Sequence, residues 1–443
     1  MASPSQRPRT IYTVGSHAQQ TSMARPGHGG RLTRKDFVVN ISVEEQLHII
    51  SSGAQNIVPL DDLRKKLAKG TPLNVKLGVD PTSPDLHIGH AVPLHKMRQF
   101  QDLGHHVTLI IGDGTALIGD PSGKNTTRPQ LTSEQIAANA KTYVEQAVKV
   151  LDSDPAKLTI VHNADWILSM DLKKLLEVCS RFTVARILER DDFTKRYNAK
   201  TPIALHEFLY PVMQAYDSVM IKADVEMGGN DQLFNLLAGR ELMEKMGMEP
   251  QVCLTMPLLE GTDGVRKMSK SYGNYIGVTD TADDMFGKTM SIPDELIVRY
   301  FRLATQVPVA EVDEIERGLS AGTADPNAEK RRLARAICDA YHGAGAGNAA
   351  EEHFNAVHRN HEVPEDIASF ATDLSGEVYL PGLFQELGFA KTSSEGRRLI
   401  DGGGVKVNGE PLAAKTYNVS GSDIENAVIQ AGKLRFVRIV PKH

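Results

Sequence analysis

Residues 73–90 read LNVKLGVDPTSPDLHIGH, an apolar strand that runs into a proline-rich turn and then into a helix. That helix extends to about Leu103 and is closed by Gly104. Residues 107–112, VTLIIG, form a second apolar run without polar alternation, which is typical of a strand covered on both faces. The pattern predicts a βαβ unit, and therefore a parallel sheet and the α/β class.

Beyond this unit, the chain gives a coarser pattern of helices interrupted by short strands. A helix is predicted over residues 41–69, with Leu47, Ile50, Ile57 and Leu60 on one buried face. The other expected elements are helices over 133–216, a strand over 218–225 and charged helices over 309–367.

Composition excludes several classes of protein. The chain has 443 residues, 41% of them hydrophobic and 24% charged, with a formal net charge of −5. This length supports two or three domains, and no apolar run approaches the roughly 18 residues that a membrane span needs. The net charge gives no general reason to expect nucleic-acid binding, so any RNA contact would depend on local patches. Three widely separated cysteines, Cys179, Cys253 and Cys338, suit a reducing compartment.

The amino-terminal segment differs from the rest of the chain. Its first 35 residues contain six lysines and arginines and no acidic residue, and they are rich in Ser, Gly and Pro. Residues 1–38 are therefore predicted to be a disordered extension. The composition also matches an organelle transit peptide, with an upstream start as an alternative. We expect a cytoplasmic protein, or an organellar one if the extension is a targeting signal.

Three further domains are predicted. Residues 39–260 form the catalytic domain, 261–375 a loop segment with a helical domain, and 376–443 a small C-terminal α+β domain. In the last domain, helices over 383–387 and 393–400 precede a hairpin at Asn408-Gly409. Nearby cations suit binding to an RNA backbone, although a packing or dimerisation module remains open. These cations are Arg397, Arg398 and Lys406.

His87 and His90 lie where the first strand passes into its helix. Ligands of open parallel sheets bind beyond the carboxyl ends of the strands, and helix N-termini favour anions. The two imidazoles are therefore candidate phosphate donors. Two histidines at this spacing can share a metal ion, but no third ligand lies nearby, so no metal site is predicted. Simple packing remains the alternative for the motif alone.

Residues 266–271, RKMSKS, begin 176 positions after His90. Gly261, Gly264 and Gly273 flank this cationic run and indicate a mobile loop. Such a loop suits closure over a leaving pyrophosphate. A solvated surface loop is the alternative, since this is the usual role of a charged run.

Two more patterns indicate a small polar ligand. Tyr210, Gln214 and Asp217 lie at i, i+4 and i+7, so they share one helix face and need polar partners there. Residues 228–232, GGNDQ, follow a strand-like run and open a helix. Asp231 could be an N-cap or could accept hydrogen bonds from ribose hydroxyls.

The two signature runs resemble those of class I aminoacyl-tRNA synthetases, and the wider set is similar to the bacterial tyrosyl-tRNA synthetase family. The likeness covers about residues 40–443, and its C-terminal part resembles a small RNA-binding domain first described in a ribosomal protein. The runs that carry it are HIGH (87–90), GDPSGK (119–124), YPVMQAYD (210–217), GGNDQ (228–232) and KMSKS (267–271).

The resemblance implies a Rossmann-like fold and activation of tyrosine by ATP, followed by transfer to a cognate tRNA. It implies Mg²⁺ with ATP as a substrate complex, no tightly bound cofactor, a homodimer and no membrane association. The implied catalytic residues are His87, His90, Lys267 and Lys270. The implied ATP-binding residues are Asp80, Thr82, Gly89, Lys124, Arg128, Gly229, Asp231, Met268 and Ser269. The implied tyrosine-binding residues are Asp120, Tyr210, Gln214, Asp217 and Gln232.

The sequence departs from the family at Lys76, where many members have a tyrosine that contacts the substrate phenol. Phenol recognition without that tyrosine, or an altered pocket, would follow. Three alternatives stay open: a tryptophanyl-tRNA synthetase, a synthetase-derived RNA-binding or splicing cofactor, and a nucleotidylyltransferase. The C-terminal segment argues against the last, and the intact His and Lys motifs argue against a non-catalytic relative.

Overall fold

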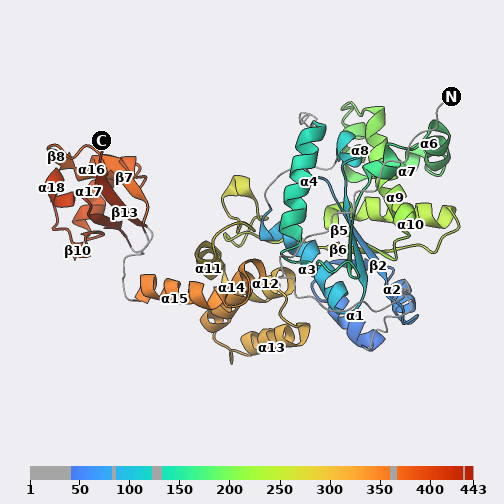
Figure 1. The fold of residues 1–443 in the computed structure, drawn as a ribbon, viewed down its shortest axis with the longest axis horizontal. Helices are drawn as coiled ribbons and strands as arrows, with labels where there is room; N and C mark the ends of the chain where they lie inside the picture. Colours follow the sequence, from blue (N-terminus) through green and yellow to red (C-terminus); the bar gives the residue numbers. More distant parts are fainter. Residues whose placement is uncertain (1–40, 82–85, 122–131, 360–366, 433–434, 443) are drawn as a thin grey trace, which may run out of the picture. The chain divides into compact units, whose positions relative to one another are not determined.

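The computed structural model describes residues 41–81, 86–121, 132–359, 367–432 and 435–442 (Figure 1). Two compact units make up the chain, one ending at Gly347 and the other beginning at Asn348. Among the described helices, none combines the length and the apolar character that crossing a membrane would require.

A six-stranded sheet forms the centre of the first unit, in the order β1-β6-β5-β2-β3-β4. All neighbouring strands are parallel except the edge strand β1, which is antiparallel to β6. The predicted βαβ unit and parallel sheet are thereby confirmed. The strands are β1 (Asn56–Val58), β2 (Asn74–Val79), β3 (His106–Ile111), β4 (Leu158–His162), β5 (Val225–Gly229) and β6 (Val252–Met256).

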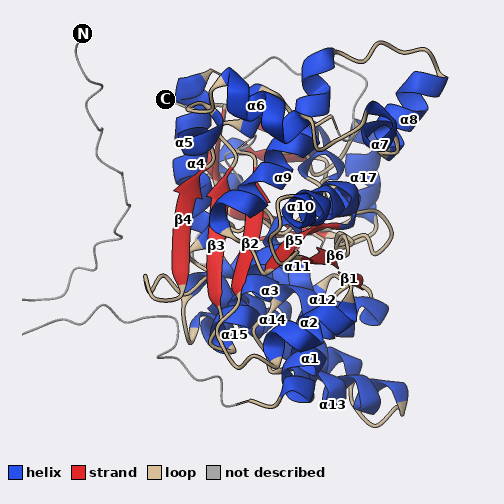
Figure 2. Ribbon diagram, turned by 90° about the vertical axis from the view of Figure 1, so that its right-hand side faces the viewer, coloured by secondary structure: helices blue, strands red, loops and turns tan. Residues whose placement is uncertain are grey.

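Helices cover both faces of this sheet. Figure 1 shows α3 and α4 on one side and α9 and α10 on the other, and Figure 2 shows the strands side by side. The helices of this part are α1 (Val43–Ser51), α2 (Leu60–Leu67), α3 (Ile88–Asp102), α4 (Ser133–Ala147), α5 (Ala164–Ile167), α6 (Leu172–Cys179), α7 (Val184–Leu188), α8 (Asp191–Asn198), α9 (Leu209–Ile221) and α10 (Leu233–Lys245).

The core lies between these layers. Val75, Leu109, Ile110 and Leu254 are fully buried on the central strands. Burial of each such side chain contributes about 1.5–3 kcal/mol relative to exposure. The predominantly apolar strands seen in the sequence are therefore explained by a sheet that is covered on both faces.

A helical segment follows the sheet and packs against α3 through α12. Local sequence sets its boundaries: α14 begins at Pro326, whose missing N–H costs nothing there, and Asp325 caps it by accepting from two backbone N–H groups. The helices are α11 (Ala282–Met290), α12 (Ile297–Ala304), α13 (Val309–Ser320), α14 (Pro326–His342) and α15 (Ala346–Arg359).

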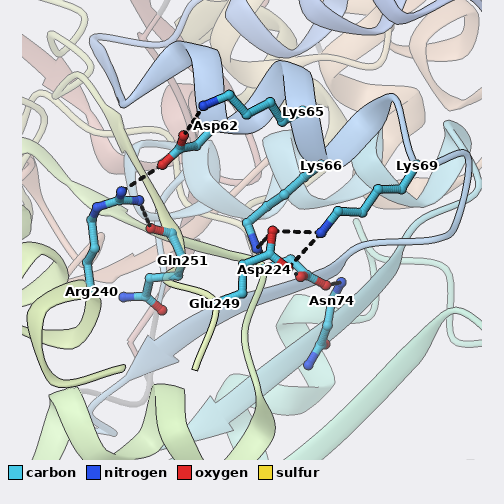
Figure 3. A network of polar contacts seen from close by, with 9 residues as sticks. All are labelled: Asp62, Lys65, Lys66, Lys69, Asn74, Asp224, Arg240, Glu249 and Gln251. Carbon is cyan, nitrogen blue, oxygen red and sulfur yellow. Dashed lines mark hydrogen bonds and ion pairs between the residues drawn. The ribbon is translucent and has the colours of Figure 1, made fainter. Parts of the chain in front are cut away.

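Buried charges hold α2 to the amino-terminal end of the sheet (Figure 3). Lys66 Nζ lies 3.2 Å from Asp224 Oδ1, and the other oxygen of Asp224 accepts from the Asn74 N–H at 2.9 Å. Arg240 donates to Asp62 at 2.7 Å. Only Lys66 is fully buried, and its partner Asp224 stays partly exposed, so these pairs contribute less than fully buried ones do. This network lies at the end of the strands opposite to the one where ligands are expected.

Three sequence-based expectations were wrong. Residues 41–69 are not one helix, because β1 separates α1 from α2 and Leu60 is 43% exposed. The helical stretch over 133–216 is interrupted by β4. The strand expected over 218–225 is instead the end of α9, and β5 begins only at Val225. A short apolar run fits a buried helix as well as a strand.

The second unit has its own core, which includes Leu380, Phe384, Ile400 and Ile429. Both predicted helices and the hairpin at Asn408-Gly409 are confirmed. A five-stranded sheet has the order β10-β9-β12-β13-β7, and β11 pairs with β8. The elements are β7 (Ser369–Thr372), β8 (Glu377–Tyr379), α16 (Leu380–Glu386), α17 (Ser393–Asp401), β9 (Val405–Val407), β10 (Glu410–Pro411), β11 (Asn418–Ser420), α18 (Gly421–Ile424), β12 (Val428–Ala431) and β13 (Arg435–Pro441).

Candidate active site

The candidate site lies at the carboxyl ends of β2, β3 and β5. Strand order runs outward from β2 in both directions, so the chain reverses there and leaves the crevice where α/β folds bind ligands. Asp80 follows β2, Gly112 follows β3, and Gly229 ends β5. A Cβ on Gly112 would lie 2.1 Å from Asp80 Oδ1, so only glycine permits this approach.

His87 and His90 stack at the N-terminus of α3, with ring centroids 3.6 Å apart. His87 is the N-cap residue, and its backbone N–H donates to His90 Nδ1 at 3.4 Å. Burial lowers the pKa of His87 to about 3, with smaller contributions from His90 and Lys270. Burial followed by Lys270 and Lys267 lowers the pKa of His90. Both rings are therefore neutral at pH 7, and each can offer one N–H donor.

The KMSKS run (residues 267–271) lies beside this histidine pair, although the two are far apart in the sequence. A Cβ placed on Gly89 would lie 3.4 Å from Met268 Cβ and 3.0 Å from His87 Nδ1. Met268 is buried and its N–H donates to the Leu259 carbonyl at 2.9 Å, whereas Lys267 is exposed. Met268 thus anchors the run beside α3.

Asn274 organises this loop from within. Its side-chain oxygen accepts from the Ser269 N–H at 2.8 Å. Its Nδ2 donates to the Lys267 carbonyl at 3.2 Å and to Asp263 at 3.1 Å. A Cβ on Gly261 would lie 2.3 Å from the Asn274 amide. The loop conformation therefore depends on this one buried amide.

Asp217 is buried on α9 with two partners. Trp166 Nε1 donates to Oδ1 at 2.8 Å and Asn163 Nδ2 donates to Oδ2 at 3.2 Å. Burial raises the pKa of Asp217 to about 6, and the Lys76 charge followed by these hydrogen bonds opposes the rise. A carboxylate has about four acceptor positions, so Asp217 can accept a further hydrogen bond.

Asp80 joins Tyr210 to the same network. Tyr210 Oη donates to Asp80 Oδ2 at 2.8 Å, and Thr115 Oγ1 donates to Oδ1 at 2.9 Å. Asn163 in turn donates to Thr115 at 3.2 Å, which links Asp80 to Asp217. Burial raises the pKa of Asp80 to about 7, against the effect of its two hydrogen bonds.

Asp120 is held by a residue that the sequence did not single out. Arg190, which is buried, donates to Asp120 Oδ1 at 2.6 Å and also pairs with Asp192 at 3.0 Å. Gln232 Nε2 donates to the other Asp120 oxygen at 3.1 Å. The structure therefore places Asp120 beside Gln232, as a shared tyrosine site would require.

Gln214 completes the polar set. Its Nε2 donates to Glu226 Oε1 at 3.1 Å, and its Oε1 accepts from Asn235 Nδ2 at 3.0 Å. Asn235 also donates to Gln232 Oε1 at 2.8 Å. Hydrogen bonds thus connect Gln214 to Gln232, and through it to Asp120.

The remaining candidates divide by location. Asp231 is exposed beside Gly229, where a Cβ would lie 2.5 Å from Asp231 Oδ1. Arg397, Arg398 and Lys406 belong to the second unit, with Arg397 and Arg398 exposed on α17. Thr82, Lys124 and Arg128 lie outside the described residues.

Sequence reasoning missed the residues that hold the candidates in place. Trp166 had a usable signal, because it is the only tryptophan of the chain. Arg190 and Asn163 had none, because they reach the site from segments far from α9 in the sequence. Glu226 follows α9 closely on β5, but no sequence pattern shows that its side chain turns back toward Gln214. Within the described part of the chain, no group of three or more His, Cys, Asp and Glu side chains is placed to hold a metal ion.

The chain matches two protein families. Residues 68–359 match the family described as tRNA synthetases class I (W and Y), and residues 383–424 match the S4 domain. The tyrosine–tRNA ligase of Geobacter sulfurreducens is 48% identical over 404 residues, which cover 90% of this chain and 99% of that protein. The Thermotoga maritima tyrosine–tRNA ligase is 48% identical over 396 residues, 89% of this chain and 97% of that protein.

Solved structures show the same fold at lower identity. A C-terminally truncated mitochondrial tyrosyl-tRNA synthetase from Aspergillus nidulans has a TM-score of 0.60 at 22% identity, covering 71% of this chain and 94% of that one. The Archaeoglobus fulgidus tyrosyl-tRNA synthetase, solved with L-tyrosine, has a TM-score of 0.57 at 22% identity, covering 70% and 99%.

Proposed function

Since the chain belongs to the class I tRNA synthetases of the tryptophan and tyrosine group, we infer that it is an ATP-dependent tyrosine–tRNA ligase. It activates tyrosine with ATP and then transfers it to the 3′-terminal adenosine of its tRNA. The observation that carries this inference is the meeting of the two signature runs, seen in the 3.4 Å approach of Met268 to a Cβ on Gly89.

The chemistry of activation needs charge stabilisation and positioning rather than a base. The tyrosine carboxylate, already an anion, attacks the α-phosphorus while the bond to the β-phosphate breaks and pyrophosphate leaves. We assign His87 and His90 as neutral donors and Lys267 and Lys270 as cations toward the developing charge. Each preorganised donor of this kind contributes about 3–4 kcal/mol. Mg²⁺ enters with ATP as part of the substrate, and no tightly bound cofactor is proposed.

Tyrosine would occupy the pocket lined by α9. Asp217 would accept a hydrogen bond from the phenol hydroxyl, and the hydrogen bonds from Asn163 and Trp166 would hold the Asp217 carboxylate in place. The α-ammonium of tyrosine would be held by Asp120, Tyr210 and Gln214. The tyrosine carboxylate would lie close to Gln232, which donates to Asp120.

Nucleotide contacts follow from the ends of the strands. The ribose is assigned to Asp231, with Gly229 permitting close approach of the backbone. Asp80 and Gly89 lie on the path of the phosphates, and Met268 and Ser269 line the loop that closes it. Thr82, Lys124 and Arg128 keep their expected role in ATP binding as part of this proposal.

Pyrophosphate exchange tests the substrate. With tyrosine, the protein should catalyse ATP–pyrophosphate exchange, and with tryptophan or phenylalanine at equal concentration it should be nearly silent. Exchange with tryptophan alone would make it the other member of the group. No exchange with any of the three would favour a non-catalytic, RNA-binding role.

The second unit is proposed to bind tRNA. Arg397 packs against two aromatic rings, at 5.8 Å from the centroid of the exposed Tyr379 and 5.3 Å from that of the partly buried Tyr417. Arg398 and Lys406 add positive charge on α17 and β9. Arginine and lysine supply the backbone contacts on which RNA affinity depends. Replacing both arginines by alanine should weaken tRNA binding at least tenfold and leave pyrophosphate exchange unchanged.

A homodimer is proposed from the surface of the first unit. Among the described residues, large exposed hydrophobic side chains concentrate in the sequence between positions 168 and 205, and exposed apolar surface of this kind marks an interface where the side chains form one patch. Leu172→Asp with Leu176→Asp should produce a monomer in sedimentation velocity. The exposed hydrophobic side chains of this stretch are Leu168, Leu172, Leu176, Val184, Tyr197 and Leu205.

A cytoplasmic location is proposed as well, on the basis of the bacterial relatives and the three free cysteines. An organellar location would apply if residues 1–38 direct import. Fractionation of cells that express the full chain distinguishes the two.

A further inference from the structure

Lys76, which the sequence analysis singled out, is completely buried on β2. Its Nζ lies 3.0 Å from Glu226 Oε1 and donates to Ser218 Oγ at 2.7 Å and to the Gln214 carbonyl at 3.2 Å. All three ammonium donors therefore have an acceptor. Two of these acceptors belong to α9, so Lys76 ties the pocket helix to the sheet.

Glu226 faces Lys76 directly across the sheet. The two residues are Cα partners on the parallel strands β2 and β5, so strand register fixes the pair. Glu226 is also buried, and Ser218 donates to its Oε2 at 3.1 Å. Gln251 donates to the same oxygen. A buried charge pair with all its hydrogen bonds made is held in one geometry.

The orientation of Gln214 follows from this pair. An ionised carboxylate only accepts, so the Gln214 amide must turn its Nε2 toward Glu226, at 3.1 Å. Its Oε1 then points the other way, toward Asn235. An amide oxygen in that position can accept from a substrate ammonium, whereas the flipped amide would present a donor.

Charge links the same pair to Asp217. The charged groups that act on Asp217 are Lys76 from β2, Glu226 from β5 and Asp80 beyond the end of β2. Lys76 is the strongest influence that lowers the pKa of Asp217 against burial, and Glu226 raises it more weakly. At neutral pH, Lys76 thus favours the ionised carboxylate that a phenol hydroxyl can bind.

We propose that Lys76 and Glu226 are positioning residues for tyrosine: Glu226 sets the Gln214 amide with its oxygen toward the substrate, and Lys76 fixes α9 and keeps Asp217 an acceptor. This proposal rests on the proposed function and deepens it, because it names the buried residues that orient the groups assigned to tyrosine.

The test uses Glu226→Gln and Lys76→Met, which remove one charge each. In Glu226→Gln, a neutral amide can donate as well as accept, so Gln214 loses its fixed orientation. The KM for tyrosine in pyrophosphate exchange should rise at least tenfold, and the KM for ATP should stay within twofold. Tyrosine affinity by equilibrium dialysis should fall in parallel.

The pH profile of kcat/KM for tyrosine separates positioning from loosened packing, because it reports groups of the free enzyme. Without Lys76, the acid limb should move to higher pH by about half a unit or more. Without Glu226, a charge that raises the pKa of Asp217 is removed, and the limb should move to lower pH. Loosened packing would shift both variants alike.

Lys66→Met is the matched control. Lys66 is another buried lysine paired with a carboxylate, but its partner Asp224 precedes β5 and accepts from the Asn74 N–H at the start of β2, outside the residues assigned to tyrosine (Figure 3). It should lose stability as Lys76→Met does, with KM for tyrosine and the acid limb unchanged. If Lys76→Met does not fold, Glu226→Gln carries the test alone.

The proposal is overturned if Glu226→Gln keeps the wild-type KM for tyrosine, or if the two pH limbs move together or not at all. Absence of tyrosine-dependent exchange in the wild-type protein would instead refute the proposed function, so the two failures are distinguishable.

Discussion

The side of the site proposed for tyrosine is built from buried and partly buried side chains that already hydrogen-bond to neighbouring residues, whereas the side proposed for the nucleotide presents exposed lysines on a loop. Asp217, Tyr210 and Gln214 each have partners in the folded protein. Lys267 and Lys270 are exposed, and the loop that carries them is fixed through Met268 and Asn274 instead.

This difference indicates two modes of binding. A buried network with an acceptor position still open at Asp217 discriminates by shape and hydrogen bonding, because a ligand without a matching hydroxyl leaves that buried position unpaired. Exposed cations contribute charge, and their effect grows when the substrate excludes water. We therefore expect the two sides to fail separately when mutated.

Asp217→Ala should have the largest effect. Without the buried acceptor, selection for the phenol hydroxyl is lost together with most activity. The selectivity at stake is about 10⁴–10⁵ against phenylalanine, a figure already known for tyrosyl-tRNA synthetases. Pyrophosphate exchange with each amino acid measures it, and the ratio should approach one. Full selectivity in the variant would show that the hydroxyl binds elsewhere.

Lys270→Ala should slow adenylate formation by about 10²–10³, the usual cost of removing one preorganised donor. Tyrosine affinity should remain within twofold, because Lys270 lies outside the buried network. Single-turnover kinetics and equilibrium dialysis give the two numbers. An unchanged rate of adenylate formation, or an equal loss of tyrosine affinity, would contradict the expectation that the two sides of the site fail separately.

His95 lies on α3, the helix that begins at the His87–His90 motif, but it is not among the residues assigned to tyrosine or ATP. It is buried between Tyr341 and Gln306, and burial alone lowers its pKa to about 3. The folded state therefore excludes a proton that the unfolded chain binds below pH 6.5. Stability from this site is complete above pH 6.5 and lost as pH falls, by about 2 kcal/mol at pH 5.

Urea unfolding at pH 7.5 and pH 5.0 checks this expectation, with His95→Gln as the comparison. The variant should show the smaller pH dependence by about that 2 kcal/mol, which is roughly a 30-fold change in the folding equilibrium. Its kcat at pH 7.5 should match the wild type within twofold. Equal pH dependence in the two proteins would place the titration elsewhere.

Asn274→Ala should have the smallest effect, raising the KM for ATP about tenfold with tyrosine affinity unchanged. The variant leaves the Ser269 N–H and loop carbonyls unpaired, which costs about 1–3 kcal/mol and loosens the lysines. Asn327→Ala, on the solvent-exposed start of α14, is a control that should not change KM. A wild-type KM in Asn274→Ala would mean that Met268 alone sets the loop.

Strong local patterns predicted the centre of the fold. The βαβ unit was predictable because β2 and β3 are mostly apolar and largely buried, and because a glycine follows the helix between them. Strands β1 and β4 were missed because they are short and only partly buried. β6 is fully buried and was missed because a five-residue apolar run has no period of its own.

The site was predictable only where its residues share an element or a known motif. The spacing of Tyr210, Gln214 and Asp217 placed them on one helix face, and in the structure each of the three has a hydrogen-bond partner. The partners themselves come from other segments, as Arg190 does for Asp120, and spacing says nothing about such pairs. The consequence of Lys76 also needed the structure, because its partner Glu226 lies 150 positions away on a neighbouring strand.

A crystal structure of the protein with tyrosine and a non-hydrolysable ATP analogue tests the central claim most directly. We predict the triphosphate between the His87–His90 pair and the lysines Lys267 and Lys270, with the tyrosine hydroxyl on Asp217. A triphosphate that contacts only one of these groups, or a phenol that points away from Asp217, would contradict it.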